Sequence, residues 1–517
     1  VIQLNDNSLI AVHETAGNIA VKKSTDLGVT WSPQILVFNQ KNGINMATPD
    51  ILQLDDSSIL VCYNPRPQGN NTDTTKKYAI KTIKSYDGGL TWADDRLLFE
   101  ASHNFEDGCW EPSALQLPNG EIQLFFSNEA SYTTSNEQNI SLLRSVDKGL
   151  TWSSTPQIVS FRIGKRDGMP KPMLLNNNED IIFSIEDNFT ENFKPYTIRN
   201  SVSQNWYEII DGYSNKRDYA LLEAIDDNIY AGAPYLAQLS TGETILSYQG
   251  TEGRIENNLE NSEMKVTIGD NKAYGFTKKT IPFNVLSNSS ALWNSISVLN
   301  DDTLIAVTSS NGLSNTNKTE VWMIKGHVVP EINATNTTIT VDGNENESLW
   351  DTTFPIFIGH KSNTRLRANV FYDNENLYIV SKTTDANIVS QVANTEDNDG
   401  IIIYIDPTDR SLVAPGKEIF KIFLSSGNMI SLYEGDNRIW KKADKSTFEI
   451  ICETKINTSG YVQEMAIPWE LLGGKPSLNT RIGFNIELSE KGNSSYVDGI
   501  SNNINNQSYT WSTLKLK

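Results

Sequence analysis

The octapeptide Ser24–Trp31 (STDLGVTW) decides the fold, because it returns as Ser85–Trp92 (SYDGGLTW) and Ser145–Trp152 (SVDKGLTW). The three copies share the pattern Ser-x-Asp-x-Gly-x-Thr-Trp, and their tryptophans are 61 and 60 residues apart. In such a segment the aspartate can accept hydrogen bonds from downstream backbone amides, and the glycine supplies a positive φ. The Thr-Trp pair then begins a strand. The repeat therefore predicts three closed β-turns, and we expect their aspartates to be structural.

A second phrase is interleaved with the octapeptides and occurs six times. It consists of alternating apolar residues, a leucine, a turn of Asn, Asp or Gly, and an apolar strand, which is typical of a β-hairpin. The leucines of the six copies are Leu4, Leu54, Leu117, Leu175, Leu239 and Leu299. Their spacing of 50 to 64 residues allows four short strands in each interval. Six sheets arranged radially form a propeller, whereas the repeats of a solenoid are usually shorter.

The octapeptides resemble the Asp boxes of the sialidase-like propellers. The resemblance extends from Val1 to about Val329 and implies a six-bladed β-propeller as the catalytic domain, residues 1–329. It also implies that the Asp boxes lie on the rim away from the active site.

The composition changes after Val329-Pro330, where Asn, Thr and Glu accumulate. We interpret residues 330–338 as a linker and residues 339–517 as a second domain. Apolar alternation resumes at Leu377–Val380, Ile401–Ile405, Ile419–Leu424 and Ile482–Ile486. This pattern predicts an antiparallel β-sandwich, so the whole chain is expected to be all-β.

Short phrases of the second domain resemble family-nine carbohydrate-binding modules in order and spacing. They are Val341-Asp342-Gly343 with Glu347 and Trp350, Tyr372-Asp373 before Leu377-Tyr378, Tyr404–Pro407, and Tyr461 with Glu464–Trp469. The resemblance implies that this domain binds carbohydrate and holds the enzyme on polysaccharide.

The composition excludes several classes of protein. With 517 residues, 38% hydrophobic and 21% charged, the chain is able to bury a large core. Its 63 acidic and 43 basic side chains give a net charge of -20, which disfavours nucleic acid as a partner. The longest apolar runs have strand length and fall short of the roughly 20 residues that cross a bilayer, so we expect no membrane span.

Cysteine and histidine are sparse. Three cysteines and four histidines at wide spacings exclude a dense disulfide framework and a compact zinc site. The chain begins at Val1 without methionine or an apolar export segment, so we expect a processed protein that is secreted, periplasmic or held at the cell surface. We also expect a monomer.

The inner strands of a propeller converge on a central channel, and catalytic groups are expected at its mouth. Glu111 lies between Trp110 and Pro112 at the start of the third inner strand, an apolar setting that raises the pKa of a carboxyl group. Glu186 lies at the far end of the fourth hairpin. Because two carboxylates facing one glycosidic oxygen are the minimum for sugar hydrolysis, these glutamates are the predicted catalytic pair.

Several segments resemble the exo-1,5-α-L-arabinanase family, glycoside hydrolase family 93. They are Trp110–Pro112, Leu117–Gly120, Gln138 before Ser145, and Arg166–Pro170 followed by Glu186. The resemblance implies a retaining, exo-acting hydrolase that releases terminal sugars from an arabinan-like glycan. It implies Glu111 as the acid/base and Glu186 as the nucleophile.

Other residues near the channel mouth are expected to bind the sugar, because carboxylates and arginines bond hydroxyl groups and indoles stack on sugar rings. They are Asp50, Arg66, Trp110, Arg166, Asp167, Asp187 and Trp293. Glu129 and Glu137 are interpreted as polar loop residues, with substrate hydrogen bonding as the alternative.

Two alternative functions stay open. An exo-α-sialidase needs three arginines that clamp a sugar carboxylate, for which Arg66, Arg166, Arg217 and Arg254 are candidates. A lectin or adhesin uses the same propeller without catalysis. The hydrolytic chemistry requires no cofactor, and Asp-rich loops are compatible with a structural calcium ion.

Overall fold

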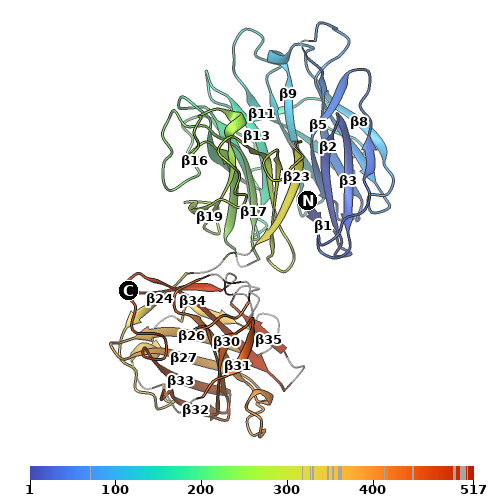
Figure 1. Cartoon of the computed structure of the whole chain (residues 1–517). Coiled ribbons are helices and arrows are strands. Elements are labelled where there is room, and N and C mark those ends of the chain that lie inside the picture. The colour runs from blue at the N-terminus through green and yellow to red at the C-terminus, as the bar shows by residue number, and fades with distance from the viewer. Residues whose placement is uncertain are drawn as a thin grey trace. The chain divides into compact units, whose positions relative to one another are not determined.

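Figure 1 shows the computed structural model of the chain. It describes all residues except 70, 241, 317, 327, 329, 330, 346, 347, 352, 353, 359–363, 411, 413, 445–447, 493–495, 501–507, 509 and 510. The chain divides into two compact units, Val1–Gly326 and His327–Lys517. The predicted boundary at Val329-Pro330 and the predicted motif residue Glu347 lie outside the described residues. The described part of the chain has no helix with the length and apolar character of a membrane span.

The first unit consists of six antiparallel sheets, each made of consecutive strands (Figure 1). The first three sheets contain β1 (Ile2–Gln3), β2 (Leu9–Thr15), β3 (Asn18–Ser24) and β4 (Ile35–Phe38); β5 (Ile44–Gln53), β6 (Ile59–Pro67), β7 (Ala79–Ser85) and β8 (Ala93–Glu100); and β9 (Cys109–Gln116), β10 (Ile122–Asn128), β11 (Asn139–Ser145) and β12 (Gln157–Ser160). The last three contain β13 (Asp167–Leu174), β14 (Asp180–Asp187), β15 (Lys194–Ser201) and β16 (Arg217–Tyr219); β17 (Ala231–Gln238), β18 (Thr244–Gly250), β19 (Glu263–Gly269) and β20 (Thr277–Thr280); and β21 (Ala291–Val298), β22 (Leu304–Ser310) and β23 (Glu320–Gly326).

The first strand of each sheet contacts the first strand of the next, so β1, β5, β9, β13, β17 and β21 surround a common axis. The ring closes between the sixth and first sheets. There the Ser297 hydroxyl donates to the Val1 carbonyl at 2.5 Å, and the Asn300 amide donates to Gln3 Oε1 at 2.8 Å. The predicted six-bladed propeller is therefore confirmed.

The two sequence repeats occupy fixed places in the blades. Each of the six leucines is buried in the turn between the first and second strands, with at most 4% of its surface exposed. The octapeptides form the turns between the third and fourth strands of the first three blades. In the second copy, Asp87 accepts hydrogen bonds from the Thr91 amide at 2.9 Å and the Thr91 hydroxyl at 2.6 Å. These bonds lower the pKa of Asp87 to about 2.

The second unit is built from one large curled sheet. Its strands are β24 (Glu331–Asn336), β25 (Ile356–Ile358), β26 (Arg365–Tyr372), β27 (Asn376–Thr384), β28 (Gly400–Asp406), β29 (Phe420–Ser425), β30 (Ile430–Asp436), β31 (Ile439–Lys442), β32 (Ile451–Asn457), β33 (Gly460–Pro468), β34 (Arg481–Glu490), β35 (Tyr496–Gly499) and β36 (Ser512–Leu516). The main path runs β31-β30-β29-β28-β34-β36-β24-β26-β27-β33-β32. Most pairs are antiparallel, as predicted, but β24 runs parallel to both β26 and β36. Apolar side chains from both halves of this path form one core.

The helical content of the described residues is four short 3-10 turns. These are Phe105–Asp107, Leu259–Asn261, Ser348–Asp351 and Thr395–Asp397.

Candidate active site

Five of the six inner strands carry the same irregularity near the channel. In each, two residues oppose a single residue of the second strand, which is a β-bulge, and the first bulged residue has a positive φ. These residues are Thr48 (42°), Glu111 (44°), Met169 (52°), Ala233 (48°) and Trp293 (52°). A non-glycine residue with positive φ is uncommon, and bulges that redirect a side chain cluster at active sites. The sequence signal of the bulge is a proline, which follows the first four of these residues.

The bulges also connect neighbouring blades. The Met169 amide donates to Ser127 Oγ at 2.9 Å, and the Trp293 amide donates to Gln249 Oε1 at 2.8 Å. The Ala233 amide donates to Glu186 Oε2 at 2.9 Å. In all three cases the acceptor side chain comes from the end of the second strand of the preceding blade.

Glu111 is held by an arginine from the preceding blade. Arg66 Nη2 lies 2.8 Å from Glu111 Oε1, and Arg66 Nε donates to Asn64 Oδ1 at 2.6 Å. The guanidinium also lies 5.0 Å from the centre of the Trp110 ring. Burial raises the pKa of Glu111, while the charge and hydrogen bond of Arg66 oppose that rise. The Glu111 side chain keeps 22% of its surface exposed.

Glu186 lies between two glycines. It pairs with Gly168 in the ladder of its own blade, and a Cβ at Gly232 of the next blade would lie only 2.4 Å from Glu186 Oε2. The same Cβ would lie 2.5 Å from the hydroxyl of Tyr230. Both glycines therefore leave the space that this carboxylate occupies.

The surroundings of Glu186 favour its protonated form. Burial raises the pKa of Glu186 to about 7, and the negative charge of Glu111 adds to the rise, while the Ala233 amide and Arg166 oppose it. Because the charge of Glu111 acts on Glu186, the two predicted catalytic glutamates lie near each other. Their assignment as the catalytic pair stays a prediction.

A third carboxylate, Glu129, borders this space. It is 2% exposed, forms an ion pair with Arg166, and accepts a hydrogen bond from Gln138 Nε2 at 2.9 Å. Burial raises the pKa of Glu129 to about 7, against the opposing charge of Arg166. Arg166 keeps 32% of its side chain exposed and is therefore available to a ligand.

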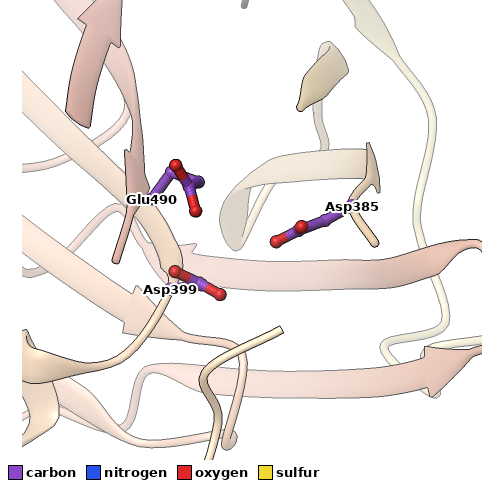
Figure 2. Close-up of side chains that lie close together, drawn as sticks. All are labelled: Asp385, Asp399 and Glu490. Carbon is purple, nitrogen blue, oxygen red and sulfur yellow. The ribbon is translucent and has the colours of Figure 1, made fainter. Parts of the chain in front are cut away.

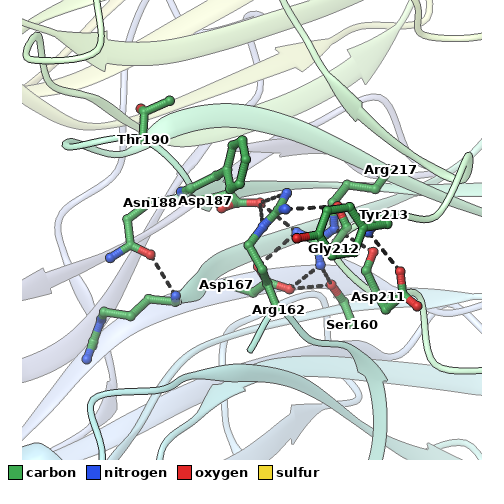
Figure 3. Close-up of polar contacts among 12 residues, drawn as sticks. Ser160, Arg162, Asp167, Asp187, Asn188, Thr190, Asp211, Gly212, Tyr213 and Arg217 are labelled. Carbon is green, nitrogen blue, oxygen red and sulfur yellow. Dashed lines mark hydrogen bonds and ion pairs between the residues drawn. The ribbon is translucent and has the colours of Figure 1, made fainter. Parts of the chain in front are cut away.

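Asp167 and Asp187 lie in a buried ion-pair network in the fourth blade (Figure 3). Arg217 donates to Asp167 Oδ2 at 2.6 Å and to Asp187 Oδ2 at 2.7 Å, and Arg162 donates to Asp187 Oδ2 at 2.9 Å. Ser160 Oγ also donates to Asp167 at 2.5 Å. Both carboxylates are 0% exposed, so their contacts fit a role in positioning the fourth blade rather than direct contact with a sugar.

Asp50 follows the bulge of the second blade and is bonded to side chains of three other blades. Its Oδ2 lies 2.7 Å from Lys171 Nζ and accepts from the Ser113 hydroxyl at 2.5 Å, and its Oδ1 accepts from the Tyr235 hydroxyl at 3.1 Å. These four side chains follow the bulges of four blades. This network is a polar cluster that joins four blades.

The two predicted tryptophans differ in exposure. Trp293 is 54% exposed at its bulge, which makes its indole available for stacking. Trp110 is 6% exposed and packs against Tyr78 and Phe105, with ring centroids 4.8 and 4.9 Å away. Its contact with the Arg66 guanidinium and its burial fit a supporting role for Arg66 better than direct contact with a sugar.

The other candidate arginines of a sialidase clamp are already engaged. Arg217 is paired in the network of Figure 3, and its side chain is 1% exposed. Arg254 donates to the carbonyls of Asn261, Leu286 and Ser289, and its side chain is 6% exposed.

Sequence reasoning missed Tyr230, Lys171 and Tyr235. Burial raises the pKa of Tyr230, and its hydroxyl accepts from Gln249 Nε2 at 3.0 Å. The sequence signal for Lys171 and Tyr235 was the proline of the bulge, because these two residues directly follow Pro170 and Pro234.

The second unit matches a family model described as carbohydrate family 9 binding domain-like over residues 341–514, which confirms the predicted resemblance of that region. Endo-1,4-beta-xylanase A of Thermotoga neapolitana is 26% identical over 248 residues, covering 46% of this chain and 22% of the xylanase. The chain thus spans about a fifth of the length of the curated relatives that it matches.

Two solved structures are similar to parts of the chain. A family 9 carbohydrate-binding module from Caldicellulosiruptor kristjanssonii, in complex with cellotriose, is 17% identical with a TM-score of 0.31, covering 36% of this chain and 93% of the module. The family 93 α-L-arabinofuranosidase of Fusarium graminearum, in complex with arabinobiose, is 18% identical with a TM-score of 0.46, covering 63% of this chain and 91% of the enzyme.

Proposed function

We propose that the propeller is a glycoside hydrolase that removes terminal sugars, with Glu111 and Glu186 as its catalytic pair. The observation that carries this proposal is the proximity of two carboxylates from neighbouring blades: the negative charge of Glu111 raises the pKa of Glu186, and burial raises the pKa of both. A pKa of about 7 for Glu186 supplies a proton donor near neutral pH. The ion pair with Arg66 favours the ionised form of Glu111, against the effect of burial.

These contacts favour the opposite order of roles from the one implied by the arabinanase resemblance. In the proposed retaining reaction, the ionised Glu111 attacks the anomeric carbon while Glu186 gives its proton to the departing glycosidic oxygen. The C–O bond to the leaving group breaks and a glycosyl ester on Glu111 forms. Glu186 then removes a proton from water, which attacks the same carbon and releases the sugar and the Glu111 carboxylate.

The charges at the mouth support a neutral sugar as substrate. Arg66 and Arg166 are each paired with a glutamate, and Arg217 and Arg254 are engaged inside the blades. A sialic acid carboxylate would have to displace these partners. An arabinan-like substrate fits better, with Trp293 as a stacking surface and Arg166 as a hydroxyl ligand.

The second unit is proposed to bind polysaccharide and keep the propeller near its substrate, since a tethered second site raises the effective concentration. Its match to the family 9 model supports this role. An enzyme of this type acts on glycans outside the cell, so secretion is part of the proposal.

The test is release of monosaccharide from a panel of chromogenic glycosides that includes an α-L-arabinofuranoside and a sialoside. We expect hydrolysis of the arabinofuranoside, and loss of that activity with retained sugar binding in Glu111→Gln. Hydrolysis of the sialoside instead would favour the sialidase alternative. No release from any glycan, with binding intact, would favour the lectin.

A further inference from the structure

Tyr230 lies beside Glu186 at the start of the fifth blade, directly before β17. A Cβ built on Gly232 would lie 2.5 Å from the Tyr230 hydroxyl oxygen and 2.4 Å from Glu186 Oε2, so both oxygens border the same small space. Burial and the negative charges of Glu186 and Glu111 raise the pKa of Tyr230. A hydroxyl group from the fifth blade therefore lies close to the proposed catalytic pair.

The hydrogen bonds of Gln249 fix the direction of this hydroxyl group. Gln249 is 0% exposed, and its Oε1 accepts the Trp293 amide at 2.8 Å. Its Nε2 is therefore the donor of the side chain, and it donates to the Tyr230 oxygen at 3.0 Å. Tyr230 thus receives a hydrogen bond on its oxygen and keeps its own proton for another acceptor. Within the described ranges of the chain, no residue accepts that proton.

The backbone of Tyr230 is held as firmly as its side chain. Its amide donates to Asn257 Oδ1 at 3.0 Å, and its carbonyl accepts the Thr251 amide at 3.0 Å. The hydroxyl group therefore has a fixed place beside Glu186 and does not depend on a mobile loop for its position.

A donor at this place favours the ionised form of Glu186. The raised pKa of Tyr230 means that the hydroxyl keeps its proton wherever Glu186 titrates, so it acts as a donor. An ionised carboxylate accepts a stronger hydrogen bond than a neutral carboxyl group does. The other groups that act on Glu186 are Glu111, whose charge raises its pKa, and the Ala233 amide and Arg166, which lower it.

We propose that Tyr230 is a positioning residue of the hydrolytic site, which donates a hydrogen bond to Glu186 Oε2 whenever Glu186 is ionised. This inference rests on the proposed function of Glu186 as the proton donor. In the first step the proton of Glu186 moves to the glycosidic oxygen, and the Tyr230 hydroxyl turns toward the carboxylate that remains. In the second step Glu186 takes a proton from water and the bond weakens again. Tyr230 itself gives up no proton and forms no covalent bond.

Removal of the hydroxyl group should make Glu186 a weaker acid. A hydrogen bond to the ionised form lowers a pKa, so Tyr230→Phe should raise the pKa of Glu186 above its value of about 7. The loss of one bond to a charged group corresponds to about one pKa unit. Hydrolysis is lost as the pH rises through the pKa of Glu186. The basic limb of kcat/KM should therefore move by about one unit to higher pH, and the plateau should fall by up to about tenfold.

The first test compares Tyr230→Phe with Tyr219→Phe by kcat/KM on an unactivated disaccharide between pH 5 and pH 10. Tyr219 is the matched control, because its hydroxyl accepts the Ile225 amide at 2.9 Å, and its removal also leaves one N–H group without its acceptor. Tyr219→Phe should keep the plateau and both limbs. A lower plateau in Tyr230→Phe with an unmoved basic limb would be a purely structural effect and would overturn the proposal.

The second test does not need turnover. Infrared titration follows the protonation of buried carboxyl groups directly, and the band of Glu186 is the one that Glu186→Gln lacks. This assignment is needed because burial also raises the pKa of Glu129 to about 7 and that of Asp399, in the second unit (Figure 2), to about 6. Glu186 should titrate near pH 7 in the unmodified chain and about one unit higher in Tyr230→Phe.

The two tests separate this inference from the hydrolase proposal. If the unmodified chain hydrolyses no glycan but the Glu186 band moves in Tyr230→Phe, the hydrolase proposal fails and the hydrogen bond stands. If the band does not move, the inference is overturned, whether or not the chain is a hydrolase. Should Tyr230→Phe not fold, crystals of the unmodified chain at pH 5 and pH 9 decide. At pH 9 the hydroxyl should lie about 2.5–2.7 Å from the Glu186 carboxylate, and a separation beyond hydrogen-bond distance overturns the inference.

Discussion

Replacing Arg66 by glutamine should move the acid limb of the pH profile of hydrolysis to higher pH and leave the basic limb in place. The Arg66 guanidinium lies 2.8 Å from the Glu111 carboxylate, and the two side chains are 27% and 22% exposed. For charge centres about 4 Å apart, an effective dielectric constant of about 20 gives roughly 4 kcal/mol. Because solvent screens part of this attraction, only a fraction of it should appear as a rise in the pKa of Glu111.

The direction in which each limb of the pH profile moves follows from the role of each carboxylate. Glu111 must be ionised to attack, so a higher pKa removes activity as the pH falls through the new value. Glu186 must be protonated, so activity is lost as the pH rises through about 7 in both proteins. At pH 9 only about 1% of Glu186 carries its proton, and kcat/KM should be about 100-fold below the plateau.

The assay is kcat/KM between pH 4 and pH 9 on arabinobiose, or on the disaccharide of whichever sugar the glycoside panel identifies. An unactivated disaccharide is needed, because its alcohol leaving group requires the proton donor. Arg66→Lys is the control, since it keeps the positive charge and should shift the acid limb much less. If the basic limb moves and the acid limb stays fixed, the roles of Glu111 and Glu186 are exchanged. If neither limb moves, the electrostatic argument is refuted.

Three further outcomes are expected. Glu111→Gln should reduce hydrolysis by about 10³-fold or more without changing the unfolding temperature, as measured by initial rates and calorimetry. Gly232→Ala should reduce kcat by about 100-fold, because its Cβ would lie 2.4 Å from Glu186 Oε2, whereas Gly326→Ala, which meets nothing within 4 Å, should leave kcat unchanged. Arg217→Met should lower the free energy of unfolding by about 3–5 kcal/mol in a urea titration, because it leaves the buried Asp167 without a cation and Asp187 with Arg162 alone; an unchanged urea midpoint would contradict the network of Figure 3.

The propeller could be predicted because its repeats are local. Each octapeptide closes its own turn, as the Asp87 and Thr91 bonds show, so the signal does not depend on distant residues. The nearness of Glu111 and Glu186 could also be expected, because one lies in an inner strand and the other at the channel end of the hairpin in the next blade; their role as a catalytic pair stays a prediction. The arginines could not be assigned in this way, because Arg217 reaches Asp167 from 50 residues further along the chain.

The orientation of Asp187 could be predicted from the sequence. Glu186 and Asp187 are neighbours in β14, and successive side chains of a strand point to opposite faces. If Glu186 faces the channel, Asp187 must face away from it. Its complete burial against Arg162 and Arg217 is therefore consistent with the alternation of the strand.

The position of Glu186 explains how a propeller can acquire a proton donor at little structural cost. Ser127 and Gln249 occupy the same place at the end of the second strand in neighbouring blades, and both accept a hydrogen bond from the bulge amide of the next blade. Glu186 makes that same contact with Ala233, so its side chain is already held by a bond that the fold uses elsewhere. That bond stabilises the ionised form, but burial and the charge of Glu111 outweigh it and raise the pKa to about 7. The chemistry proposed for Glu186 thus depends on its burial and the neighbouring charge, whereas its geometry depends on a structural contact that a neutral residue also makes.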